Sequence, residues 1–91
     1  MIFFRRVSGD SMTPTLYDGQ TVICHQFRGF KKGQIVVAFV KNTEVIKRVV
    51  KVDVDKIYLG VDGKKHAHNG KYYAVISDTK VEGVVFWPRN L

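Results

Sequence analysis

The sequence predicts an all-β (mainly β) fold: a compact, coiled antiparallel sheet or a partly open barrel. Valine and isoleucine are frequent, and both residues favour strands. Turn residues interrupt the apolar runs at short intervals. No window repeats its apolar residues with the 3.6-residue period of a helix. With 45% apolar and 25% charged residues, the chain of 91 residues fits one folded domain, residues 1–91.

Each predicted strand is bounded by turn signals. The expected strands are residues 2–7, 21–26, 34–40, 44–54, 57–59, 72–76 and 83–87. Asp18-Gly19 is a strong turn pair before the second strand. The nearly continuous apolar run 34–40 is typical of a strand buried on both faces, and the turn at 41–43 joins it to the next strand as a hairpin. Residues 60–70 are the longest irregular stretch, and a short helical turn around 15–17 is left open.

The net charge of +7 favours anionic partners. Lysine and arginine are nevertheless spread along the chain, and no basic–aromatic motif repeats, so nucleic-acid binding is not expected. Cys24 is the only cysteine, which excludes an intramolecular disulfide framework, and its apolar run predicts a buried thiol. His66 and His68 would share one face of an extended segment, but two histidines alone are weak evidence for a metal. We expect no metal and no cofactor.

The sequence predicts a soluble chain. No apolar run approaches the roughly 18–20 residues of a membrane span. The first six residues are too short for a signal peptide and carry their charges on the wrong side of the apolar stretch. A cytoplasmic location follows as the default.

Ser11 is the first candidate for chemistry. It lies on a bend between two predicted strands, with Gly9 before it and Pro14 after it. Taken alone, a serine in such a place is an ordinary turn residue. As a nucleophile it needs a base, because its hydroxyl hardly ionises near neutral pH. His25, beside an apolar strand position, is a weak candidate for that base.

Lys47 is the stronger candidate for the base. The two-residue period of a strand puts Lys47 on one face with Val45 and Val49, where the amine could be partly buried. Burial lowers the pKa of an amine, and a fall from about 10.4 to near 7 needs roughly 4 kcal/mol. A neutral amine could then take the proton of Ser11. Spacing alone leaves the alternative open that the Lys47 amine extends from the sheet into water.

Four segments resemble, in the same order, motifs of the signal peptidase I and LexA-like serine proteases. They are residues 9–16 (GDSMTPTL), 18–22 (DGQTV), 33–37 (GQIVV) and 45–50 (VIKRVV). This resemblance implies a Ser–Lys dyad with Ser11 as nucleophile and Lys47 as general base. It also implies the family's coiled, mostly antiparallel β domain and a protein or peptide substrate, bound in extended form along a strand edge.

The resemblance implies further site residues. The backbone N–H of Ser11 would help to form an oxyanion hole, and Met12 would line the substrate pocket beside Gly9. A late segment, residues 77–83 (SDTKVEG), loosely matches the family's D-S-R-x-x-G, so Ser77, Asp78 and Thr79 are the expected support for Lys47. Ile76 stands where signal peptidases have a serine, and the family's membrane anchor is absent from the sequence.

Three functions stay open on the sequence. The first is a soluble serine endopeptidase that acts on another protein. The second is a LexA- or UmuD-like regulatory domain that forms a homodimer, with cleavage secondary; the Ala-Gly and Cys-Gly dipeptides at which that branch cleaves itself do not occur here. The third is a basic β module that binds nucleic acid or protein.

Overall fold

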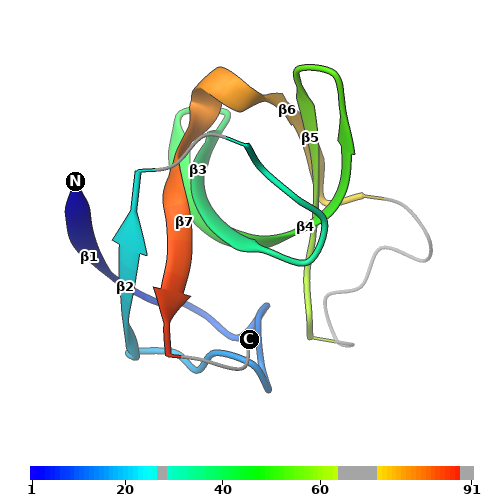
Figure 1. The fold of residues 1–91 in the computed structure, drawn as a ribbon. Helices are drawn as coiled ribbons and strands as arrows, with labels where there is room; N and C mark the ends of the chain where they lie inside the picture. The colour runs from blue at the N-terminus through cyan, green and yellow to red at the C-terminus, as the bar shows by residue number, and fades with distance from the viewer. Residues whose placement is uncertain (27–28, 64–71, 89–91) are drawn as a thin grey trace.

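The computed structural model describes residues 1–26, 29–63 and 72–88. They form an antiparallel sheet that curls into a half-barrel (Figure 1). The strands are β1 (Ile2–Arg6), β2 (Thr21–His25), β3 (Ile35–Val40), β4 (Thr43–Asp53), β5 (Lys56–Gly60), β6 (Ala74–Ser77) and β7 (Val81–Trp87), in the spatial order β1-β2-β7-β3-β4-β5-β6. The all-β prediction is confirmed, and each predicted strand is present with ends that differ by one or two residues.

The turns differ in detail from the prediction. Residues 15–17 form no helix; they belong to a turn in which the Leu16 amide donates to the carbonyl of Met12 (2.9 Å). The β3–β4 hairpin turns on two residues, because Val40 already pairs with Thr43. A single 3-10 turn, η2 (Asp78–Lys80), joins β6 to β7.

The last strand of the chain completes the centre of the sheet. β7 lies between β2 and β3 and pairs antiparallel with both. It thereby joins the β1–β2 pair to the strands β3 to β6 (Figure 1). β3, in the middle, is buried on both faces, as its apolar run predicts: Val36 and Val37 point to opposite faces and both are fully buried.

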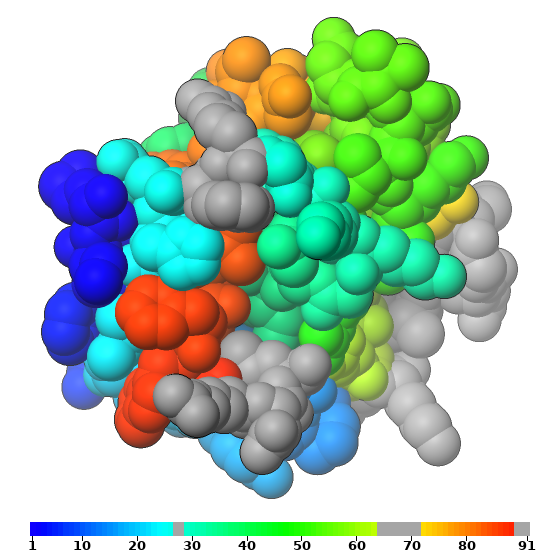
Figure 2. All heavy atoms as spheres, viewed as in Figure 1, coloured from blue at the N-terminus to red at the C-terminus, as the bar shows by residue number. Residues whose placement is uncertain are grey.

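Two apolar clusters pack on the two faces of β3. The first contains Val7, Met12, Leu16, Val22, Cys24, Ile35, Val37 and Val85. The second contains Val36, Ala38, Val49, Ile57, Leu59, Val81 and Val84. The Cys24 thiol is buried as predicted, and the loss of water raises its pKa to about 11, so it stays protonated at neutral pH. In the space-filling view no open channel is visible where the ribbon of the described residues curls (Figure 2).

Within the described part of the chain, no helix has the length and apolar character needed to cross a membrane.

The β4–β5 turn contains a strained residue. Val54 has a φ of 49°, a left-handed conformation that a β-branched residue rarely adopts, and its side chain is 95% exposed. We therefore expect Val54→Asn to stabilise the protein by about 0.5–1 kcal/mol, since asparagine tolerates this conformation and no packing is lost. Urea unfolding measures the change, with Val52→Asn in the neighbouring strand as a control that gains nothing. An unchanged midpoint for Val54→Asn would refute the prediction.

Candidate active site

Ser11 lies on a bend that two buried side chains anchor to the first cluster. Met12 is 1% exposed and Leu16 is fully buried. Inside the bend the Thr13 amide donates to the carbonyl of Asp10 (3.1 Å), which closes a turn around Ser11. The position of the serine is therefore set by core packing on one side and by backbone hydrogen bonds on the other.

The chain enters and leaves the bend through paired backbone groups. Gly9 has a φ of 84°, which favours glycine, and its amide donates to Oδ1 of Asp18 (2.8 Å). The amides of Val7 and Gly19 donate to the carbonyls of Gln20 and Val7, each over 2.8 Å. The two ends of the segment are thus tied together at its base.

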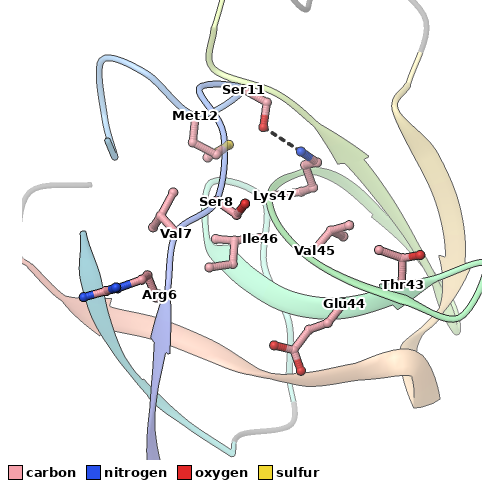
Figure 3. Close-up of a pocket in the computed structure, with 10 residues that line it drawn as sticks. All are labelled: Arg6, Val7, Ser8, Ser11, Met12, Thr43, Glu44, Val45, Ile46 and Lys47. Carbon is pink, nitrogen blue, oxygen red and sulfur yellow. Dashed lines mark hydrogen bonds between the residues drawn. The ribbon is translucent and has the colours of Figure 1, made fainter. Parts of the chain in front are cut away.

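The structure brings the two predicted residues of the dyad into contact. Nζ of Lys47 lies 2.6 Å from Oγ of Ser11 (Figure 3). Lys47 is only 8% exposed, so its amine does not extend into water, the alternative that spacing left open. When the amine carries three protons it donates to the hydroxyl, and when it is neutral its lone pair can accept the serine proton over the same distance.

Burial controls the charge of the lysine. It lowers the pKa of Lys47 from the ordinary value, because the ammonium form loses water on entering the site. The ring of Tyr73 covers the amine, with 4.5 Å between Nζ and the ring centroid. An aromatic face favours the cation by about 0.5–2 kcal/mol, so it offsets part of this penalty.

A groove begins at the Ser11–Lys47 pair. Its volume is about 260 Å³. One side is formed by residues 6–8, Ser11 and Met12, and the other side by residues 43–47 of β4 (Figure 3). Among the described strands, β5 pairs with β4 only from Arg48 onwards, so residues 43–47 have β3 on one side and the groove on the other. The groove therefore runs along a strand edge, where an extended peptide can add to the sheet.

The other predicted site residues lie in two places. Met12 lines the groove, whereas Gly9 shapes the bend behind it. Ser77 and Thr79 lie at the corner between β6 and η2, where their hydroxyl oxygens are 3.0 Å apart and Oγ of Ser77 caps the 3-10 turn. The backbone amide of Asp78, in the same corner, donates to the carbonyl of Asp55 (2.8 Å). Support of Lys47 by Ser77, Asp78 and Thr79 stays a prediction.

Sequence reasoning missed the residues that surround the pair. The sequence pattern places Tyr73 in a predicted strand and Asp62 in the long irregular stretch 60–70, and indicates a role for neither. In the structure Asp62 bonds Arg48, the residue after Lys47, and Gly63 bonds the carbonyl of Ser11. Only Arg48 offered a sequence signal for this contact. Strand alternation directs its side chain away from that of Lys47, so its charge needs a different partner.

The described residues contain no group of three or more His, Cys, Asp or Glu side chains arranged to hold a metal ion. His66 and His68, the two histidines considered for a metal, lie outside the described residues.

Known proteins resemble this chain in sequence. The Peptidase S24-like family matches residues 1–86. Signal peptidase IB of Staphylococcus aureus strain Mu50 / ATCC 700699 is 41% identical over 69 residues, covering 65% of this chain and 36% of that protein. The protein of the same name from strain N315 matches with the same figures, and that from strain COL is 39% identical over 69 residues. The chain thus spans about a third of the length of the curated relatives it matches, 36% in each case.

The lowered pKa of Lys47 predicts a pH-dependent stability. Between the lowered pKa and about 10.4, the unfolded chain binds more protons at this lysine than the folded protein does, so stability rises with pH, by at most about 1.4 kcal/mol per unit. In Lys47→Met this contribution is absent. The free energy of unfolding of the native protein minus that of Lys47→Met should therefore increase from pH 7 to pH 10, as measured by urea unfolding.

Lys32→Met, which removes an exposed lysine, is the matched control and should keep the pH slope of the native protein. An identical slope for Lys47→Met and the native protein would show that burial does not disfavour the charged amine.

Proposed function

The chain belongs to the Peptidase S24-like family, and we propose that it is a serine endopeptidase in which Ser11 is the nucleophile and Lys47 the general base. One observation carries the proposal: the amine of Lys47, a residue that is 8% exposed, lies 2.6 Å from a serine hydroxyl at the end of a groove. Desolvation lowers the pKa of the amine and so favours its neutral form, and the short distance lets that form act on the hydroxyl.

The proposed reaction has two halves. Oγ of Ser11 attacks the carbonyl carbon of the substrate while its proton passes to Nζ of Lys47. The resulting ammonium gives that proton to the leaving amine as the peptide C–N bond breaks, which leaves an acyl group on Ser11. A water molecule then attacks the acyl carbon and gives a proton to Nζ, and this proton returns to Oγ when the acid product departs.

The proposed oxyanion hole uses the backbone N–H of Ser11. The carbonyl of Asp10 is held inward by the Thr13 amide (3.1 Å). Because the N–H and C=O of a trans peptide point in opposite directions, the N–H of Ser11 is directed out of the turn, where the substrate oxyanion would form. Core packing of Met12 fixes this peptide group before substrate arrives.

The proposed substrate is an extended protein segment. It would lie in the groove beside residues 43–47 and make main-chain hydrogen bonds with that edge of β4. The side chains of Val7, Met12 and Ile46 make part of the lining apolar, which favours small apolar substrate residues next to the cleaved bond. The name of the staphylococcal relatives makes a protein that carries a signal peptide the first substrate to test.

The dyad predicts that Ser11→Ala and Lys47→Met each lower kcat by a factor on the order of 10⁴. The double variant should be about as inactive as either single variant, because the two side chains act as a unit. Product formation from a signal-peptide substrate, followed by mass spectrometry, measures both effects. Lys32→Met is the control and keeps the native rate. Cleavage that persists in both single variants would rule out the Ser–Lys mechanism and favour a binding or dimerisation role for the chain.

The lysine predicts the pH profile. Activity needs the neutral amine, so kcat/KM should rise with pH and reach half of its maximum below the ordinary lysine pKa of about 10.4, because burial lowers the pKa of Lys47. Initial rates from pH 6 to pH 10 test this. A rate that does not change over that range would contradict Lys47 as the base.

A further inference from the structure

We propose that Asp62 and Gly63 are positioning residues that hold the Ser11 bend against the strand carrying Lys47. They follow β5 in the chain and contact both halves of the candidate site. The catalytic consequence rests on the proposed function, whereas the positioning of the Ser11–Lys47 pair does not and can be measured without a substrate.

The Asp62 carboxylate joins the two segments of the site. Its Oδ1 accepts from Nε of Arg48 (3.1 Å), and its Oδ2 accepts from Nη2 of Arg48 and from Oγ1 of Thr15 (2.5 Å each). Arg48 is the residue after Lys47, and Thr15 lies four residues after Ser11. One side chain therefore fixes the distance between the bend and β4.

Gly63 holds the bend at Ser11 itself. Its amide donates to the carbonyl of Ser11 (2.7 Å). A Cβ at this glycine would lie 3.0 Å from the carbonyl oxygen of Asp10 and 3.1 Å from that of Ser11. Any side chain here would push on the backbone that carries the nucleophile, so the close approach requires glycine.

The charges in this contact are largely shielded from water. The side chains of Arg48 and Asp62 are 18% and 17% exposed. Burial alone raises the pKa of Asp62, but the hydrogen bonds from Arg48 and Thr15, together with the charge of Arg48, lower it below the ordinary value. The carboxylate is ionised at neutral pH, and bonds to an ionised acceptor are about twice as strong as neutral ones.

The positions of the two apolar clusters explain why such a contact matters. The bend is anchored in the first cluster through Met12, whereas β4 contributes Val49 to the second. Ile46 of β4 also packs against the first cluster, but no β4 side chain is among the buried members of that cluster, so hydrogen bonds supplement packing in setting the Ser11–Lys47 distance. A displacement of about 1 Å between reacting groups can lower the rate about 100-fold, so the Asp62 and Gly63 contacts would preserve the reactive distance.

The decisive variants are Thr15→Val and Thr15→Ser. Valine has the shape of threonine without the hydroxyl, whereas serine keeps the bond to Asp62. We expect Thr15→Val to lower kcat about 10–100-fold with KM within about twofold of the native value, and Thr15→Ser to restore most of the rate. In ¹³C-lysine-labelled protein, the titration midpoint of the Lys47 side chain should move towards the ordinary lysine value in Thr15→Val and stay unchanged in Thr15→Ser.

Asp62→Asn and Gly63→Ala should likewise lower kcat and move the titration midpoint of Lys47 towards the ordinary lysine value. The matched control is Asp53→Asn, which removes an exposed carboxylate at the end of β4 and should change neither kcat nor the Lys47 midpoint. Backbone amide spectra show whether each variant folds. If Asp62→Asn does not fold, Thr15→Val alone decides whether the Asp62 contact positions the Ser11–Lys47 pair.

Two results would overturn the inference. The first is a native Lys47 midpoint in both Thr15→Val and Gly63→Ala, whatever their activity. The second is loss of the native amide spectrum in all the variants expected to act, which would make these residues supports of the fold alone. If the native protein cleaves no peptide, the proposed function fails, yet the Lys47 midpoint still decides whether Asp62 and Gly63 position the pair.

Discussion

The burial of the Lys47 amine beside Ser11 is the constraint on which the candidate site depends. In water a lysine is charged at neutral pH and holds no lone pair for a serine proton. Here Lys47 is 8% exposed, and its amine lies 2.6 Å from Oγ of Ser11 and 4.5 Å from the centre of the Tyr73 ring. The loss of water around Lys47 lowers the pKa of its amine, whereas Ser11 is only half-buried and faces the groove.

The sheet topology supplies that packing. β4 lies next to β3, and β3 is buried on both faces, so the face of β4 that carries Lys47 continues a buried surface. β7, the last strand in the chain, pairs with both β2 and β3 and brings the β1–β2 pair, with the bend between them, to the same side of the sheet. Ser11 and Lys47, 36 residues apart, meet because this final strand joins the two halves.

Much of the fold could be predicted because its signals are local. Strand ends follow turn residues, and the burial of β3 follows from its apolar run. Strand period placed Lys47 beside Val45 and Val49 but left its burial open, and the ordered motifs supplied Ser11 as its partner. Tyr73 and the Thr15–Asp62 contact could not be predicted, because Thr15 and Asp62 are 47 residues apart and neither belongs to a repeating pattern. The roles of Ser77, Asp78 and Thr79 stay predictions for the same reason: a loose motif names them without saying what they touch.

Tyr73 shows how a buried base can also carry a charge. In the proposed mechanism Lys47 is neutral at rest and becomes an ammonium when Ser11 attacks, so an environment that excluded the cation entirely would also prevent proton transfer. The ring face 4.5 Å from Nζ stabilises the cation by about 0.5–2 kcal/mol without offering a proton acceptor that would hold it at rest. The developing oxyanion adds an attraction that exists only during the reaction. Burial therefore favours the neutral form of Lys47 before attack, while the ring and the negative charge that develops on the substrate favour its protonation afterwards.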